Sequence, residues 1–526
     1  MFSSAVRARN KKSRGKPAQF LHKPRGVIHS RVQAVGPEHF GLVCVDCAKL
    51  RSKWMLADFY GKILIPPTEV AHNRVELDDL LQRVRAGVAQ FGLRDCLVAI
   101  ERTGRYHHPI KNAFSAGGFD TRIVHPFATK QLRQPANPDD KTDDHDLAAI
   151  HRAAVNGFAL AEQVPQESWR DLQLLIRHRR SLVRKSSALC CQIREHLDAV
   201  LPGYAACFEK LWDSPVALRL VRQFGTAQAM LDAGVTGLRQ FLRAQGVRCH
   251  RTTLDTVLAW AQAAAPADLA ADRHRAIALA YDEDRLRKNQ EILALEREMA
   301  TRLARTPYVL LLSFPGINVI SAADFAGEMG PIEHYASPRA ITGRAGLFPS
   351  RYQSDRVDRA NGPLVRRGNR ALRAVILAIA DNLILCNAHC RMLASAWKLA
   401  GKDPRISHVK IGVRFCRIAY HMVAGKQVFN HPCLRERGWI LDKLLAFHGE
   451  RHTPWPIVLA DLQEAIAHLP NKEHAAEAQP LAEKLRNKRK GGKSGPQPLG
   501  EILAIVLARL GVGTLSCKPS GESDPA

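Results

Sequence analysis

The segment FGLVCVD, residues 40–46, is a short apolar run of strand type that ends on a carboxylate, Asp46. Two more strand-like runs follow at residues 54–60 and 63–65, separated by the turn signal Gly61-Lys62. Beyond them helix and strand patterns alternate, which predicts a mixed α/β sheet flanked by helices. The expected elements are a helix at 75–91, a strand at 96–100, a helix at 109–116, a strand at 121–124 and a helix at 143–155.

The charge of the chain points to a polyanionic partner. Lys and Arg number 77 against 50 Asp and Glu, a formal net charge of +27 over 526 residues. Neutralising phosphates releases counterions, so nucleic acid is the usual partner of such a chain. Charge that only maintains solubility, or contact with anionic lipid, is the weaker alternative because the basic residues are clustered.

The cysteines and the hydropathy pattern favour a reducing, non-membrane location. The 12 cysteines are scattered and form no disulfide framework. Cys44 and Cys47 lack a second pair at zinc spacing, and strand alternation would point them to opposite faces of a sheet. The N-terminus lacks the apolar core of a signal peptide, and no apolar stretch reaches the roughly 20 residues that span a bilayer. We expect a cytoplasmic protein.

A length of 526 residues predicts several domains. We expect a basic N-terminal arm at 1–39, an α/β domain at 40–160, a coiled-coil region with a helical insertion at 161–304, a helical domain at 305–430 and a C-terminal extension with a basic tail at 431–526.

Two long helices in the coiled-coil region carry heptad-like spacing. The first spans 166–201, and in the second Leu279, Leu286, Leu293 and Ala300 recur every seven residues. These helices can pair within one chain or between two chains. We favour an arm that joins two chains.

Four acidic residues stand where such an α/β sheet would gather carboxylates. Asp46 ends the first strand, Glu101 follows the strand 96–100, and Asp143 and Asp146 share one face at the start of a helix. Each alone has an ordinary explanation, as a turn former, a strand-end acid or a helix N-terminal acid. Together they form an oxygen-ligand set of the kind that holds Mg²⁺ for phosphoryl transfer.

The helical domain contains a dense basic patch around a serine, Ser354. Pro315-Gly316-Ile317-Asn318 precedes a helical run and is typical of a turn that presents backbone N–H groups to phosphate. No His–Asp pair near Ser354 supports a hydrolase triad, so its alternatives are attack on a phosphodiester or a loop-capping role. The patch consists of Arg339, Arg344, Arg351, Arg356, Arg359, Arg366, Arg367, Arg370 and Arg373.

These segments resemble a known family, the Asp–Glu–Asp–Asp transposases of bacterial insertion sequences, also called bridge-RNA-guided recombinases and related to pilin-gene invertases. The matching motifs are Asp46-x-x-Lys49, Glu101-x-Thr103-Gly104-x-Tyr106, Lys141-Thr142-Asp143-x-x-Asp146, Pro315-Gly316-Ile317-Asn318, Ala345-Gly346-Leu347-Phe348-Pro349, Ser354 and Gly368-Asn369 with Leu372-Arg373. The resemblance covers roughly residues 40–160 and 305–430. It does not account for the basic arm, the insertion or the tail.

The resemblance implies a RuvC-like or ribonuclease-H-like domain whose Asp46, Glu101, Asp143 and Asp146 bind Mg²⁺. It also implies that Ser354 attacks the scissile phosphate and forms a transient phosphoserine. The expected partners are donor and target DNA, a structured guide RNA, and further copies of the chain in a dimer or tetramer with composite sites. Nucleic-acid contacts are expected from Lys49, Lys141, Gly316, Arg351, Arg356, Arg366, Arg367 and Arg373.

Small departures from the family pattern accompany these matches. Asp355 stands where the family usually has glycine after the serine, and His125-Pro126 and Leu147 replace common family residues. Two alternatives to recombination remain. One is a metal-dependent nuclease or junction resolvase in which water attacks, and the other is a non-catalytic nucleic-acid-binding relative.

Overall fold

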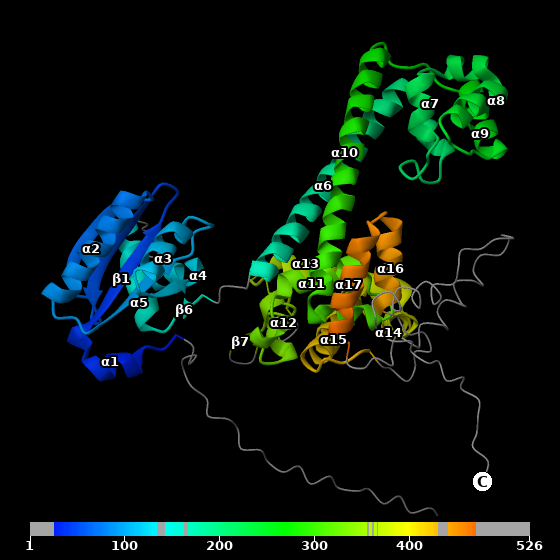
Figure 1. Ribbon diagram of the computed structural model, residues 1–526. Helices are drawn as coiled ribbons and strands as arrows, with labels where there is room; N and C mark the ends of the chain where they lie inside the picture. Colours follow the sequence, from blue (N-terminus) through cyan, green and yellow to red (C-terminus); the bar gives the residue numbers. More distant parts are fainter. Residues whose placement is uncertain are drawn as a thin grey trace, which may run out of the picture. The chain divides into compact units, whose positions relative to one another are not determined.

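The computed structural model describes residues 26–133, 142–162, 167–354, 357–359, 362–365, 367–429 and 440–469 (Figure 1). The chain divides into two compact units, residues 1–164 and 165–526. Several sequence predictions fall outside the described residues: most of the basic arm, the basic cluster at 484–493, and Lys141, Asp355, Arg356 and Arg366.

Unit 1 is built on one mixed sheet with the strand order β3-β2-β1-β4-β5-β6. Strands β1, β2 and β3 are antiparallel neighbours, β1, β4 and β5 run parallel, and β6 is antiparallel to β5. The predicted mixed α/β sheet is therefore confirmed. The strands are β1 (Phe40–Cys47), β2 (Arg51–Asp58), β3 (Ile63–Ala71), β4 (Asp95–Glu101), β5 (Asp120–Val124) and β6 (Ala159–Ala161).

Helices cover both faces of this sheet, as Figure 1 shows. One face packs Val43, Val45 and Val98 against α2 (Arg74–Gln90) and α3 (His107–Ala116). The other packs Leu42, Leu97 and Ala99 against α1 (His29–Val35), α4 (Pro126–Leu132) and α5 (Asp143–Val155). Cys44 lies in the second core and Cys47 in the first, so the prediction that their thiols point to opposite faces is confirmed.

In unit 2 the two long helices, α6 (Glu167–Val200) and α10 (Ala271–Ala304), lie side by side within the chain (Figure 1). Intramolecular pairing, one of the two alternatives, is therefore what the structure has. Leu172, Leu182 and Ile193 of α6 are buried, as the heptad spacing predicts. A further role of these helices in joining two chains stays a prediction.

The predicted seam of α10 is wrong at two of its four positions, whereas Ala300 is buried and Leu279 half-buried. Leu286 and Leu293 are 41% and 40% exposed. The buried stripe instead contains Asp282, Arg285 and Glu296, and Arg179 of α6 contacts Glu296 at 2.6 Å. Along this part of α10, residues in buried ion pairs occupy positions where apolar residues were expected. The sevenfold spacing of leucines therefore identified a face of α10 that is partly exposed.

The insertion between α6 and α10 has a core of its own. It consists of η2 (Tyr204–Cys207), α7 (Ala217–Gln223), α8 (Ala227–Ala244) and α9 (Arg251–Gln262). Tyr204, Leu220, Met230 and Leu254 are buried together there, at the end of the α6–α10 pair (Figure 1).

The remaining helices of unit 2 share one large core with the first turns of α6 and the last turns of α10. Helices α16 and α17, which follow residue 430, contribute Leu444 and Val458 to that core. The elements are η3 (Pro307–Ser313), α11 (Val319–Met329), η4 (Ile332–His334), α12 (Pro338–Ala345), β7 (Tyr352–Ser354), β8 (Val357–Arg359), α13 (Arg370–Cys386), α14 (Ala388–Leu399), α15 (Pro404–Ala424), α16 (Ile440–Glu450) and α17 (Trp455–Ala467).

Within the described part of the chain, a single helix long and apolar enough to cross a membrane is not found. Helices α13 and α14 meet the length and hydropathy criteria only when taken together, and they are bent by 96° where they join. Much of α13 packs in the large core of unit 2, including Ile376 and Leu383.

Lys443 of α16 ties this helix to the segment that precedes α11. Its ammonium group donates hydrogen bonds to the backbone carbonyls of Leu312, Phe314 and Ile317 at 2.5, 3.3 and 2.8 Å. Burial lowers the pKa of Lys443 to about 8. Three carbonyl acceptors are what an ammonium group with three donors requires when it leaves water.

The neighbouring Asp442 is buried without such compensation. Neither carboxylate oxygen of Asp442 has a hydrogen-bond partner among the residues that the structure describes, and burial raises its pKa from 3.8 to about 6. The folded chain thus holds this proton more tightly than the unfolded chain does. The cost to folding is small near pH 4, grows as the pH rises toward 6, and is complete above that value.

Asp442→Asn is therefore expected to stabilise the protein by about 2–3 kcal/mol at pH 7.5 and by only about 1 kcal/mol at pH 4.5, because Asn carries no charge to desolvate. Thermal unfolding of both proteins across this pH range measures the difference. Glu450→Gln, an exposed carboxylate on the same helix, serves as the control and should leave the midpoint unchanged. An unchanged midpoint for Asp442→Asn at pH 7.5 would contradict the expected desolvation cost.

Candidate active site

Asp46 and Glu101 lie at the same end of neighbouring parallel strands. In the β1–β4 register Val45 is opposite Ile100, so the next residue on each strand is a carboxylate. Alternation along both strands directs these two side chains toward the face that α5 covers. The predicted juxtaposition of Asp46 and Glu101 is present in the fold.

The thiol of Cys47 lies within electrostatic range of both carboxylates. Its pKa is raised to about 12, chiefly by burial, and the charges of Asp46 and Glu101 raise it further. A cation placed at this edge of the sheet would therefore be attracted by both carboxylates.

Helix α5 begins next to this edge. Thr142 caps it by accepting a hydrogen bond from the backbone N–H of His145 at 3.3 Å, and its first helical residue is Asp143, as predicted. Lys53 of β2 is the cross-strand partner of Asp46, and its ammonium contacts the carboxylate of Asp144 at 2.7 Å. Asp144 and, to a smaller extent, Asp143 raise the pKa of Lys53. This lysine thus links the first turn of α5 to the strand that bears Asp46.

Asp146 has a partner that sequence reasoning missed. Its carboxylate is buried, and the guanidinium of Arg133 contacts it at 2.6 Å. Arg133 immediately follows α4 and is itself almost buried, so the pair is shielded from water. Arg133 lies 13 residues before Asp146, and no spacing rule in the sequence connects the two.

The carboxylates at this edge suit Mg²⁺ by their chemistry, because all of them offer hard oxygen ligands. No three of Asp46, Glu101, Asp143 and Asp146 bring ligand oxygens within 4.8 Å of one another in the described part of the chain. Lys53 and Arg133 offset part of their charge. A cation held jointly by three of these carboxylates would therefore require side chains to rotate. The predicted contact residue Lys49 is exposed in the turn between β1 and β2.

The serine lies at the end of a short hairpin in unit 2. Strands β7 and β8 are antiparallel, with Ser354 opposite Val357. Ser350 extends the pairing, since its backbone N–H donates to Pro363 O at 2.9 Å and its carbonyl accepts from Gly362 N at 3.1 Å. Ser354 is therefore the last paired residue before the tip of the hairpin.

Arg373 of α13 holds the base of this hairpin. Its guanidinium donates to the carbonyls of Ala345, Val365 and Arg367 at 2.7, 2.6 and 3.1 Å. Gly346, at the end of α12, has φ of +65°, and a Cβ there would meet the same guanidinium. The described contacts of Arg373 are thus to the backbone, whereas Arg351 and Arg367 have exposed side chains.

The segment before α11 has the predicted positive φ at Gly316, which is +95°. Asn318 differs from expectation: it has φ of −106° and caps α11 by accepting from Ser321 N at 2.8 Å. The side chains of Asn382 and Asn387 donate to the carbonyls of Gly316 and Pro315. These bonds fix the turn at the start of α11.

Comparison with known proteins bears on both segments. A family described as "Transposase", of the DEDD type named for IS110, matches residues 43–202. A second, described as "Transposase IS116/IS110/IS902 family", matches residues 308–394. A "Probable family 20 transposase" of Pseudomonas aeruginosa is 25% identical over 320 residues, which cover 60% of this chain and 80% of that protein.

Both segments of the chain match IS110-type DEDD transposases. The resemblance predicted from the motifs is thus confirmed. A match to this family implies binding of DNA and, for DEDD transposases in general, dependence on a divalent metal. The first match includes Asp46, Glu101, Asp143 and Asp146, and the second includes Gly316, Ser354 and Arg373.

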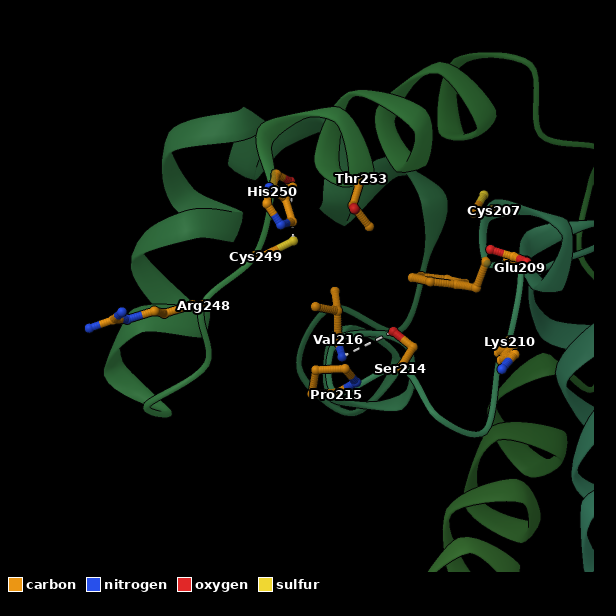
Figure 2. Close-up of a pocket in the computed structure, with 11 residues that line it drawn as sticks. Cys207, Glu209, Lys210, Ser214, Pro215, Val216, Arg248, Cys249, His250 and Thr253 are labelled. Carbon is orange, nitrogen blue, oxygen red and sulfur yellow. Dashed lines mark hydrogen bonds between the residues drawn. The ribbon is translucent and has the colours of Figure 1, made fainter. Parts of the chain in front are cut away.

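The insertion of the transposase lies between the two matched regions and holds a pocket of about 260 Å³ (Figure 2). Cys207 and Cys249 line it from opposite walls, so their thiols do not converge. Burial raises the pKa of both thiols, and Cys249 Sγ donates to the carbonyl of His250 at 3.3 Å. The pocket therefore offers neither a thiolate nucleophile nor a paired thiolate site.

Proposed function

We propose that this transposase cleaves and exchanges DNA strands by Mg²⁺-dependent chemistry through a serine–DNA intermediate. The observation that carries the proposal is the placement of Asp46 and Glu101 side by side on β1 and β4, with the acidic first turn of α5 next to them. The strand order β3-β2-β1-β4-β5, antiparallel and then parallel, supports assignment of unit 1 to the RuvC-like group.

In this proposal Asp46, Glu101, Asp143 and Asp146 hold Mg²⁺, which when bound polarises the scissile phosphate. Arg133 contacts only Oδ1 of Asp146, so this carboxylate would offer Oδ2 to the cation. Ser354 Oγ forms a bond to phosphorus while the bond from phosphorus to the 3′ oxygen breaks. The serine proton is lost to solvent, and the released 3′ oxygen takes up a proton. The 3′-hydroxyl of the exchanged strand then reverses these steps.

We further propose that carboxylates and serine come from different subunits of a dimer or tetramer, and that a structured RNA pairs with donor and target DNA. The family resemblance and the formal charge of +27 support this part of the proposal. Such a reaction belongs at the bacterial nucleoid, in the cytoplasm.

The wild-type chain tests the proposal directly. Metal-stripped protein is mixed with DNA from both flanks of its gene and with RNA transcribed from the adjacent non-coding stretch. We expect protein-linked DNA on a denaturing gel when Mg²⁺ is added, and none with a chelator. Cut strands without attached protein would support the nuclease or resolvase alternative, and DNA that is bound but uncut under all conditions would support the non-catalytic relative.

A further inference from the structure

A second cluster of metal-ligating side chains lies in unit 1 and contains none of the four predicted carboxylate ligands. His107 and His108 begin α3, and Glu162 follows directly after β6. One ligand atom from each of the three lies within 4.8 Å of the other two. In the described residues, this is the one group of three or more such side chains at that spacing. Residues more than 50 positions apart in the sequence thus converge.

His107 is in an unusual state for a buried histidine. Its side chain is fully buried, and neither ring nitrogen has a hydrogen-bond partner among the described residues. A buried polar group without a partner costs free energy, and each such group in a native protein calls for an explanation, an absent ion being one. The ring of His108 lies beside it, with centroids 4.2 Å apart.

Cationic side chains stand beside the cluster. Burial, followed by the neighbouring His108, lowers the pKa of His107. Burial alone would raise the pKa of Glu162, but the ammonium of Lys111, 2.5 Å from Oε2, outweighs it and the pKa is lowered. Lys111 and Arg102 are the cationic groups that face the cluster, and Lys111 occupies one of the two carboxylate oxygens.

We propose that His107, His108 and Glu162 bind a divalent transition-metal ion of the zinc type. Two imidazoles and one carboxylate form a mixed nitrogen and oxygen ligand set, which suits Zn²⁺, whereas Mg²⁺ prefers oxygen alone. The site therefore differs from the acidic edge in its residues and in its ligand chemistry. It is a positioning site: it connects the start of α3 to the end of β6, and α3 begins six residues after Glu101.

Zinc binding by the full-length protein tests this. Metal-stripped protein is titrated with Zn²⁺ against a chromophoric chelator, with Mg²⁺ in excess to occupy oxygen-only sites. We expect one zinc equivalent that becomes at least about tenfold weaker in Glu162→Gln and in His108→Ala. His72→Ala, a half-buried histidine elsewhere in unit 1, should bind zinc as the wild type does.

Lys111→Met separates loss of ligands from loss of fold. It removes the competing cation and keeps the buried stem, so zinc should bind more tightly in this variant. X-ray absorption of the bound zinc should show nitrogen and oxygen neighbours only. Wild-type affinity in both Glu162→Gln and His108→Ala, sulfur in the ligand shell, or weaker binding in Lys111→Met would each overturn the proposal.

Discussion

Asp46→Asn is expected to reduce DNA strand cleavage by about a hundredfold or more, while binding of DNA stays close to that of the wild type. The substitution keeps the shape of the side chain and its place on β1 but removes the negative charge that lies beside Glu101 in the β1–β4 register. A divalent cation is then held by fewer anionic ligands, and the transition state loses electrostatic stabilisation. Cleavage of labelled DNA under single-turnover conditions, with binding measured separately, distinguishes the two effects.

Asp144→Asn is the matched control for this prediction. Asp144 lies in the same acidic first turn of α5 and contacts Lys53, yet it is not part of the family motif. We expect its cleavage rate to fall by less than about tenfold, since the control removes a surface ion pair and no proposed ligand. Equal losses in Asp46→Asn and Asp144→Asn would mean that general charge at this edge matters and that no specific ligand set exists.

Ser354→Ala is expected to abolish the protein-linked DNA altogether, because no other atom of the residue can form the phosphoester bond. Strand exchange should be lost with it, since the energy of the broken phosphodiester is no longer conserved. The measurement is a denaturing gel of labelled DNA, with and without protease treatment. A linked species that persists in Ser354→Ala would assign the attack to another residue.

Ser350→Ala provides the comparison within the same hairpin. The hydrogen bonds that Ser350 makes to Pro363 and Gly362 use its backbone, so alanine retains them. We expect protein-linked DNA at close to the wild-type level. If Ser350→Ala also abolished the linkage, the hairpin as a whole would be implicated and the assignment to Ser354 would lose its support.

Much of unit 1 was predictable from the sequence because its strands end on recognisable residues. Side chains alternate between the two faces of β1, so Cys44 and Cys47 point to opposite faces. By the same alternation Asp46 lies on the face that α5 covers. Helix α5 begins at Asp143 and ends at Val155, the bounds predicted from the sequence. Local chemistry was sufficient at these positions.

What the sequence did not indicate depends on long-range contacts. Two ion pairs, Arg133 with Asp146 and Lys111 with Glu162, join residues whose spacing in the sequence matches neither helix nor strand periodicity. The three-residue strand β6 is too short to show an alternation pattern. In α10, buried Asp282, Arg285 and Glu296 occupy the stripe where apolar spacing was sought, because charges pair across the helices.

The hydrogen bonds of Lys443 to the turn before α11 have a consequence for the design of chimeric proteins from this chain and its relatives. The second family match ends at residue 394, but Lys443 lies beyond it and satisfies three carbonyls inside the matched region. A chimera that transplants only the matched segment would remove this lysine donor from all three carbonyls, of which only that of Phe314 is described with a further donor, the backbone N–H of Ile317. A segment exchanged between this transposase and a relative should therefore extend at least through α16. The boundary given by sequence similarity, residue 394, would exclude Lys443.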